Sequence, residues 1–510
     1  MSPTRRDFIR FVVAGSVAAG CPVDLSLLAA DAPEALVDGE HNEICHKVRD
    51  GITFPKPPVS TTCDVIIAGG GVSGLSAAYF LRDFDFLLLE KEPHWGGNAY
   101  LEEFEGQAFA TGSAFAEKGS DAEALSREIG LTLLPVNCPD PTIVNGKWIK
   151  DTWGGGLDSL PYPLAVRESF KKWRKDMLAI NVSKNVAHYD SQTFASFLHG
   201  YAPELKQWWD AYGPSNWGAR SEDTSALVGI QEIQWISDSV EKGDPRVTLP
   251  GGNGAISKKL AETLLTRHSQ AMLGDSTVIS VDPQDNGVNV TYLREGKPIT
   301  AQAKYVIMAT PKYITARIVS GMPASQIDAM EAIRYCPYPV VNMIFDKPVY
   351  NKAYDTWCPG NSFTDFVLAD WVMKSQPGYV QRHNILSFYT PLIESERNRL
   401  LTINGCKEIA AHVLADFHKL LPEFDVEPAE IRFYRRGHPM FMPTPETFTK
   451  TIPAARRPLD RVFFSNTDSV GPESDVSNAI SESRAGAEWV VKRLKGASAA
   501  AAGAALGIRG

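Results

Sequence analysis

Residues 64–98 read DVIIAGGGVSGLSAAYFLRDFDFLLLEKEPHWGGN. A short apolar run (65–68) meets a glycine-rich turn, and a helix-like segment (75–81) then leads to a second apolar run (86–89) that stops at Glu90. This order predicts a strand, a turn, a helix, a second strand and an acid. The same order is typical of a βαβ unit that binds a dinucleotide.

Each glycine of the turn has a separate physical task. Gly69 allows the tight exit from the strand, Gly71 lets the backbone approach a diphosphate, and Gly74 lets the helix pack closely on the sheet. Val72 and Ser73 lead into the predicted helix, whose N-terminus offers free N–H groups and a partial positive charge that suit an anion. These five residues are therefore predicted to hold the diphosphate.

Glu90 is placed to bind a ribose. It follows Gly74 by 16 residues and Gly69 by 21, as expected for an acid at the tip of the second strand. Its carboxylate would repel a 2′-phosphate, which disfavours NADP. A lone glycine motif is weak evidence in a chain with 40 glycines, but the flanking strands, helix and acid make a chance match the lesser alternative.

The segment Glu90–Asn98 resembles the one that follows the ribose-binding acid in flavin amine oxidases, carotenoid desaturases and protoporphyrinogen oxidases. In those families a glycine pair, here Gly96 and Gly97, brings the backbone to the flavin side of FAD. The resemblance implies that Lys91 and Asn98 contact the cofactor as well. The alternative is an ordinary surface turn, because Gly-Gly is a common turn signal.

The resemblance implies an α/β fold in which two dinucleotide-binding (Rossmann-like) units hold FAD beside a discontinuous α+β substrate domain. Residues 277–281, 287–292 and 305–311 are alternating or apolar and rich in β-branched residues, which predicts three strands. They look like the β-meander and return strand of the family. There the residue matching Val278 gives backbone contacts to adenine, and the strand that ends with Ala309-Thr310-Pro311 closes the sheet near the diphosphate.

A last apolar strand, residues 461–468, ends at Asp468 and precedes a helix expected from about residue 478 to 494. The resemblance implies that Asp468 and the N–H groups of Ala479 and Ile480 receive the ribityl chain and the flavin O2 edge. The chain departs from the family here: a small residue, Gly and an acid usually follow the strand directly, whereas this chain places its acid one position later.

The predicted domain boundaries follow from these strands, because each group of them brings the chain back to the cofactor-binding domain. We expect a signal peptide at 1–30, an extended arm at 31–60, an FAD-binding domain from 61–115, 245–320 and 455–495, a substrate domain from 116–244 and 321–454, and a disordered tail at 496–510.

Composition excludes several kinds of partner. The chain has 510 residues, 51 Lys and Arg against 60 Asp and Glu, and a formal net charge of -9, with no basic cluster that would bind nucleic acid. Its seven cysteines are scattered without a CxxC pair, so neither a metal site nor a disulfide framework is predicted. The Cys45-His46 pair lacks the first cysteine of a covalent haem motif, since residue 42 is Asn; a non-covalent haem on His46 stays open.

The N-terminus predicts export. Arg5 and Arg6 precede the apolar run 11–19, which is too short to span a membrane and reads as a twin-arginine signal. This route carries proteins already folded around their cofactors and implies a periplasmic or other extracytoplasmic location. Lipid attachment at Cys21 and cleavage near Ala30 are the two alternatives for processing.

The resemblance is nearest to twin-arginine-exported flavin amine dehydrogenases of the spermidine dehydrogenase type. It spans roughly residues 60–495, with less specific secondary motifs at 208–218, 225–227, 249–254, 437–439 and 443–445. It implies oxidation of the C–N bond of a polyamine or aromatic amine by hydride transfer to flavin N5. A flavin supplies the hard chemistry, so the protein needs no obligatory side-chain base.

Three residues are predicted to act near the flavin. Many amine oxidases place a lysine where this chain has Asn342. Protoporphyrinogen oxidases and desaturases also lack that lysine, so Asn342 weakens the amine interpretation. It also implies a slow reaction of reduced flavin with oxygen, which favours a dehydrogenase using a periplasmic carrier over an oxidase. His438 stands where a residue could face the flavin, and Trp357 could form an aromatic wall. The alternatives are a structural loop histidine and a core tryptophan.

Two other functions compete with amine oxidation. C–C desaturation or a protoporphyrinogen oxidase-like reaction would need a long apolar tunnel. A non-redox sugar-nucleotide mutase would use paired arginines such as Arg435 and Arg436, but export away from cytosolic sugar nucleotides argues against it.

Overall fold

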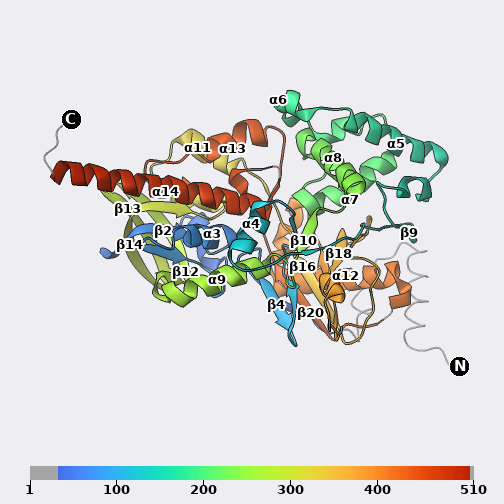
Figure 1. Ribbon diagram of the computed structural model, residues 1–510, viewed down its shortest axis with the longest axis horizontal. Coiled ribbons are helices and arrows are strands. Elements are labelled where there is room, and N and C mark those ends of the chain that lie inside the picture. Colours follow the sequence, from blue (N-terminus) through green and yellow to red (C-terminus); the bar gives the residue numbers. More distant parts are fainter. Residues whose placement is uncertain (1–32, 425, 472, 506–510) are drawn as a thin grey trace.

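The computed structural model describes residues 33–424, 426–471 and 473–505 (Figure 1). The predicted export signal, with Cys21 and Ala30, lies outside these residues. Among the helices of the described part, none is both long and apolar enough to cross a membrane.

The first domain is built on a seven-stranded sheet in the order β11-β3-β2-β14-β13-β12, with β22 also paired to β14. Strands β3, β2, β14 and β22 are parallel, whereas β12, β13 and β14 form an antiparallel meander. The three strands predicted for the meander are thus confirmed. The bounds are β2 (Val59–Ala68), β3 (Phe86–Leu89), β11 (Met272–Leu273), β12 (Ser276–Gln284), β13 (Gly287–Arg294), β14 (Lys297–Met308) and β22 (Val462–Phe464).

Three helices cover this sheet: α3 (Val72–Phe80), α9 (Gly254–His268) and α14 (Val476–Ala505). Helix α3 is rich in small residues and is buried along most of its length, because it packs against both other helices. Figure 1 shows α14 running along one side of the domain, with α9 on another. The sheet and its helices bring together parts of the chain that are hundreds of residues apart.

The second domain contains an eight-stranded sheet in the order β1-β20-β16-β19-β18-β17-β8-β9. Side chains of β16 alternate between its faces. Val341, Met343 and Phe345 pack toward α12 (Ile403–Leu420), while Val340 and Ile344 join an aromatic cluster on the other face. The bounds are β1 (Leu36–Gly39), β8 (Thr142–Val144), β9 (Lys147–Ile149), β16 (Val340–Phe345), β17 (Asp355–Trp357), β18 (Asp365–Leu368), β19 (Asn384–Tyr389) and β20 (Glu430–Arg435).

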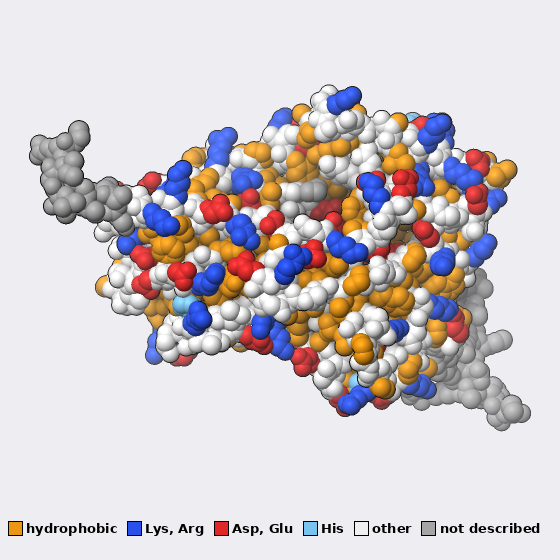
Figure 2. All heavy atoms as spheres, in the orientation of Figure 1, with side chains coloured by type: hydrophobic (Ala, Val, Ile, Leu, Met, Phe, Trp, Pro, Cys, Tyr) orange, Lys and Arg blue, Asp and Glu red, His pale blue; other side chains and the backbone are white. Residues whose placement is uncertain are grey.

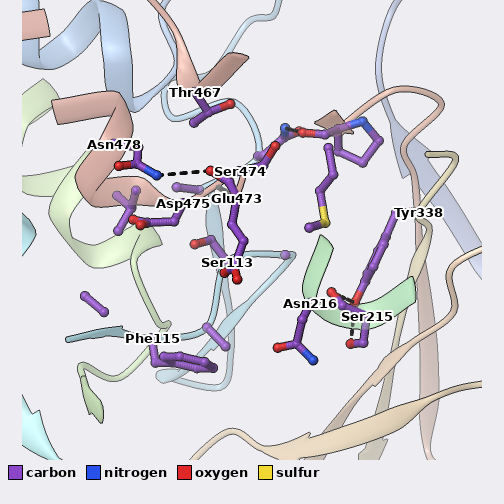
Figure 3. Close-up of a pocket in the computed structure, with 18 of the residues that line it drawn as sticks. Ser113, Phe115, Ser215, Asn216, Tyr338, Thr467, Glu473, Ser474, Asp475 and Asn478 are labelled. Atoms are coloured by element: carbon purple, nitrogen blue, oxygen red, sulfur yellow. Dashed lines mark hydrogen bonds between the residues drawn. The ribbon is translucent and has the colours of Figure 1, made fainter. Parts of the chain in front are cut away.

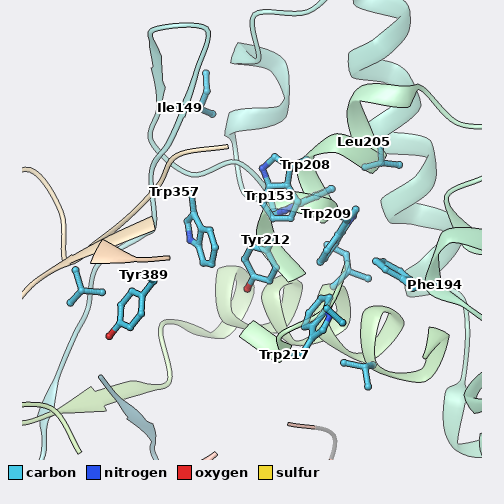
Figure 4. Packing of buried hydrophobic residues seen from close by; sticks show 14 of the residues in the cluster. Ile149, Trp153, Phe194, Leu205, Trp208, Trp209, Tyr212, Trp217, Trp357 and Tyr389 are labelled. Atoms are coloured by element: carbon cyan, nitrogen blue, oxygen red, sulfur yellow. The ribbon is translucent and has the colours of Figure 1, made fainter. Parts of the chain in front are cut away.

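A helical layer lies over that aromatic face (Figure 4). It comprises α5 (Leu164–Leu178), α6 (Val186–Asp190), α7 (Pro203–Trp217) and α8 (Ala226–Lys242). The core beneath it is dense in indole rings. Trp209, for example, is fully buried and lies 4.9 Å from Trp208 and 5.3 Å from Trp173, measured between ring centroids. This packing fixes the helices that form the roof of the cavity described below.

Shorter elements connect the two domains. The bounds are α2 (Glu43–Arg49), β4 (Leu101–Phe104), β5 (Gln107–Ala110), β6 (Ala116–Glu117), α4 (Asp121–Glu128), β7 (Leu134–Pro135), β10 (Arg246–Thr248), α10 (Lys312–Ile318), α11 (Ala324–Glu331), β15 (Tyr335–Cys336), β21 (Met440–Phe441) and α13 (Ile452–Ala455).

Both ends differ from the sequence-based expectation. The arm is not simply extended: β1 pairs in parallel with β20, and α2 packs against α10 and β12, so the arm joins the two domains. The tail expected to be disordered from residue 496 continues α14 to Ala505, as its run of alanines favours helix.

Candidate functional site

The glycine turn after β2 is tightly packed at one position and loosely packed at another. Gly69 has a φ of +107°, which favours glycine. A Cβ on Gly74 would lie 1.7 Å from the Gly69 carbonyl oxygen, so helix packing requires glycine there. At Gly71 the nearest atoms would be 3.9 Å away. A Cβ at Gly71 would therefore make only ordinary van der Waals contacts, with Gly96 and Gly97, so this position is far less crowded than Gly74.

Glu90 lies at the tip of β3 and is buried. Its carboxylate accepts hydrogen bonds from the N–H of Gly70 (2.5 Å) and of Glu92 (2.9 Å). Burial raises the pKa of Glu90, although Lys91 acts to lower it. Each carboxylate oxygen keeps a second lone pair for a ribose hydroxyl. Lys91 itself is paired with Glu92, which also pairs with His41 of the N-terminal arm.

The glycine pair lies against the turn. Gly96 and Gly97 have φ values of +120° and +58°, and Gly96 bridges to Gly71 in parallel register. Asn98 follows them; its amide donates to the Pro439 carbonyl (3.0 Å). The structure thus brings Glu90 and the glycine pair together against the glycine turn that precedes α3.

A cavity of about 550 Å³ continues from this place into the second domain (Figure 3). Its cofactor end is lined by Val72, Ser73, Gly96, Asn98, Gly112, Arg436, His438, Met440, Asn466, Thr467, Asp468 and Asn478. Glu90 and the turn glycines lie outside this lining, but Glu90 is hydrogen-bonded to the turn and the start of α3 opens into the cavity. A buried acid, a helix N-terminus and a further chamber follow one another in the order of the parts of FAD. The residues present therefore fit this cofactor.

Asp468 lines the cavity, but its carboxylate already has partners. It accepts hydrogen bonds from the N–H (2.8 Å) and Nζ (2.6 Å) of Lys312 and from the Tyr335 hydroxyl (2.6 Å). Lys312 and Asp468 are both buried, so each needs the other. The neighbouring Asn466 and Thr467 also line the cavity, and the sequence reasoning did not single them out.

The other cofactor residues named from the sequence lie in three places. Helix α14 begins at Val476, two residues before the expected start, so the Ala479 N–H already donates to the Asp475 carbonyl (3.2 Å). Ala479 and Ile480 are buried and do not line the cavity, unlike the residues of the preceding turn. Thr310 touches the glycine turn, with its methyl 3.3 Å from a Cβ placed on Gly69.

Val278 lies in β12, opposite Tyr292 of β13 and outside the cavity lining. Two residues earlier, the Ser276 N–H donates to the Glu90 carbonyl (2.7 Å). Val278 is thus near Glu90, the predicted ribose ligand, in the fold. Its contact with adenine stays a prediction.

The three candidate catalytic residues separate in the fold. His438 and Trp357 line the cavity, whereas Asn342 does not. The Asn342 amide donates to the Ala110 carbonyl (3.2 Å), and its oxygen accepts from the Ser387 hydroxyl. Burial, followed by the Arg397 charge, lowers the pKa of His438 to about 4, so this ring is neutral at physiological pH.

Aromatic side chains form the walls of the inner chamber. Trp357 and Tyr212 stack with centroids 4.3 Å apart, and Tyr338 and Tyr389 meet edge to face at 6.0 Å. The Tyr389 hydroxyl donates to the Gly112 carbonyl (2.7 Å), which ties this wall to the cofactor end. The chamber can hold an alkyl or aryl group between flat apolar faces.

Three carboxylates, Asp140, Asp355 and Asp365, reach this chamber; we call them the inner carboxylates. Asp355 is 4% exposed, and its Oδ1 has no hydrogen-bond partner. Burial raises the pKa of Asp355, and the Asp365 and Asp140 charges add to this effect. Burial also raises the pKa of Asp365 to about 7. Arg246 pairs with Asp140 (2.7 Å), so part of this charge is offset.

A second group, Glu117, Glu232, Glu473 and Asp475, lines the cavity nearer to solvent; we call these the mouth carboxylates. Glu117 and Asp475 are exposed, and Glu232 and Glu473 are half-buried. Burial raises the pKa of Glu232 to about 7, while the Tyr212 hydroxyl donates to it (2.6 Å). Figure 3 shows Glu473 and Asp475 together at one side of the pocket, and Figure 2 shows acidic side chains within a hollow of this face.

Sequence reasoning missed both carboxylate groups. Their members come from β6, the segment before β8, α8, β17, β18 and the segment before α14, and no short motif joins them. A count of acids gives no hint either, since most acids of a globular protein lie on its surface. Only the pairing of the strands and helices places them around one chamber.

Comparisons with known proteins agree with this geometry. Residues 72–490 match the model of the flavin-containing amine oxidoreductase family. Oxidoreductase PigB of Serratia is 25% identical over 508 residues, covering 81% of this chain and 73% of its own. A putrescine oxidase with putrescine bound superposes with a TM-score of 0.66 at 17% identity, over 84% of this chain and 99% of that one. Cyclohexylamine oxidase of Brevibacterium oxydans superposes with a TM-score of 0.65 at 17% identity, over 85% of this chain and 99% of that one. Both structures show a likeness of fold.

Proposed function

We propose, from the premise that this chain belongs to the family of flavin-containing amine oxidoreductases, that its substrate is an amine with two or more ammonium groups. The chain is accordingly an FAD-dependent oxidoreductase. When bound, FAD accepts a hydride from the carbon that carries the amine nitrogen. The observation that carries the proposal is the presence of two carboxylate groups along one aromatic cavity.

Electrostatics favours a cation at both groups. A unit positive charge about 4 Å from a carboxylate gains about 4 kcal/mol at an effective dielectric constant of about 20. The inner carboxylates would hold one ammonium group and the mouth carboxylates another. The alkyl chain between them would lie against Trp357 and Tyr212. A monoamine could satisfy only one of the two groups.

The inner carboxylates can also move a proton. Hydride transfer requires a neutral amine nitrogen, so the reacting ammonium group must lose a proton first. A carboxyl whose pKa is about 7, as at Asp365, is poised to accept a proton near neutral pH. Trp357 and Tyr389 would then orient the neutral amine by contact with its carbon chain.

The cavity is less suited to the competing substrates. A polyene or porphyrinogen would have to place apolar surface against buried carboxylates, which is costly. An amino acid needs a cation for its own carboxylate. In the substrate chamber Arg246 is already paired with Asp140 and Asp244, and Arg436, which has no such partner, lies at the cofactor end of the cavity. A mutase would use paired arginines, but of Arg435 and Arg436 only the second lines the cavity.

We further propose that the enzyme is exported and passes its electrons to a periplasmic carrier. The support is the Arg5-Arg6 pair before an apolar run, and the presence of Asn342 where many oxidases have lysine. Cell fractionation of the full chain and of the Arg5→Lys, Arg6→Lys double variant tests export. Retention of the wild-type chain in the cytoplasm contradicts it.

A matched pair of amines tests the substrate. Under anaerobic conditions, 1,4-diaminobutane and butylamine differ only in the second ammonium group. We expect the diamine to bleach the flavin absorbance at concentrations at least about ten times lower, a difference of about 1.4 kcal/mol. The Glu473→Gln variant should need a higher concentration of the diamine to bleach the flavin, whereas the concentration of butylamine needed should not change. Equal response to both amines, or bleaching by a porphyrinogen or polyene alone, contradicts the proposal.

A further inference from the structure

Three cationic side chains are buried in the described part of the chain: Lys312, Arg246 and Arg436. Two of them have carboxylate partners, since Lys312 pairs with Asp468 and Arg246 pairs with Asp140 and Asp244. Arg436 has no carboxylate within ion-pair distance among the described residues and is only 6% exposed. A buried charge without a counter-charge is costly, so Arg436 calls for an anion.

The contacts of Arg436 are all neutral. Its guanidinium donates to the Thr111 hydroxyl (2.9 Å), the Thr111 carbonyl (3.4 Å) and the Asn98 Oδ1 (3.3 Å). Burial lowers the pKa of Arg436, and the acids that oppose this effect, Glu40 and Glu92 foremost, act only at longer range. The guanidinium has five N–H donors, so two or more remain for another group.

The position of Arg436 indicates which part of the cofactor would lie beside it. Asn98, its partner, directly follows the Gly96–Gly97 pair, while the diphosphate belongs at the start of α3. On the other side, Gly112 lines the cavity 3.8 Å from the Arg436 Nε, measured from a Cβ placed on Gly112. The Gly112 carbonyl also accepts from Tyr389 of the aromatic chamber. Arg436 therefore lies between the diphosphate end and the substrate chamber.

We propose that Arg436 supplies the positive charge that stabilises the flavin ring after it has been reduced. A neutral amine R–CH₂–NH₂ loses a hydride and becomes the iminium R–CH=NH₂⁺, and the ring gains one negative charge with that hydride. A fixed cation beside the ring favours this charged state over the neutral oxidised ring, and nearby charge is one of the ways a protein tunes a flavin. The inference rests on FAD and on the place of the chamber, and not on which amine is oxidised.

The test is the two-electron midpoint potential of the bound flavin, measured by dye-coupled anaerobic titration of the holoenzyme. In Arg436→Gln the reduced flavin should bind at least about tenfold more weakly relative to the oxidised flavin, which lowers the potential by about 30 mV. Arg435→Gln is the matched control, because it removes the same charge one residue earlier on β20 from a side chain outside the cavity lining. Its potential should stay at the wild-type value.

A second variant, Asn98→Asp, provides a test if Arg436→Gln does not fold. Asn98→Asp is nearly isosteric and places a carboxylate beside the guanidinium, so it too should lower the potential. An unchanged potential in Arg436→Gln overturns the inference, as does equal loss of affinity for oxidised and reduced FAD, which would assign Arg436 to the diphosphate. If Arg436→Gln yields no holoenzyme, an unchanged potential in Asn98→Asp overturns it. Failure of the diamine proposal would leave all these potentials unaffected.

Discussion

Replacing Asp365 with asparagine should stabilise the fold and weaken the binding of the substrate. Asp365 is 3% exposed, and its Oδ1 accepts hydrogen bonds from the hydroxyls of Ser215 (2.7 Å) and Thr364 (2.5 Å). The carbonyl oxygen of an asparagine can accept both bonds. The substitution therefore removes mainly a charge that burial makes unfavourable.

The magnitude follows from the pKa. Burial raises the pKa of Asp365 from 3.8 to about 7, and the Asp140 charge adds to the rise. Between these values the folded state binds more protons than the unfolded state, so stability falls as pH rises through the window. Three pKa units correspond to about 4 kcal/mol, which is the upper limit of the penalty above pH 7. Asp365→Asn carries no such penalty.

Urea unfolding of the wild type and of Asp365→Asn from pH 4 to pH 8 measures this difference. The two proteins should have similar free energies of unfolding at pH 4, and the variant should gain up to about 4 kcal/mol by pH 8. At pH 8 the variant should also need at least about tenfold more diamine for half-maximal flavin reduction, because one cation site has lost its charge. A stability difference that does not change with pH, or a variant less stable at pH 8, refutes the reasoning.

Three further outcomes follow from the cofactor end. Gly74→Ala should lower the free energy of unfolding in urea by about 1–3 kcal/mol or more, because its Cβ would lie 1.7 Å from the Gly69 carbonyl oxygen. Gly71→Ala should fold normally and retain less FAD. Similar stabilities of the two variants would contradict this. Glu90→Ala should lower the flavin-to-protein absorbance ratio, because two N–H groups and the ribose lose their acceptor, and full retention of FAD would exclude that role. His438→Asn should leave the shape of the kcat/KM profile between pH 6 and pH 8 unchanged, because the pKa of His438 is about 4, and the loss of an inflection in that range would show that the ring titrates there.

The local features near residue 70 could be predicted because they depend on neighbouring residues. A strand, a glycine turn and a helix follow from apolar runs and from backbone freedom at Gly69 and Gly74, and the structure has them in that order. The meander strands are equally local, since each is an apolar or β-branched run that ends at a turn. The match to the family model over residues 72–490 agrees with the fold class expected from these segments.

Errors of position arose where the tertiary contacts define an element. Helix α14 begins at Val476, so its free N–H groups precede Ala479 and Ile480. The N-terminal arm gains a strand because β20 presents an open edge to it. Asn342 is directed away from the cavity by its bonds to Ala110 and Ser387, which belong to other strands.

The chain's local order of residues was sufficient to predict a cofactor-binding unit, because each of its interactions joins residues close in sequence. The character of the substrate chamber depends on which distant segments the fold brings together. The inner and mouth carboxylates and the unpaired Arg436 come from strands, helices and loops hundreds of residues apart. Their chemistry arises from shared burial and mutual charge, and these exist only once the two sheets and the helical layer have packed.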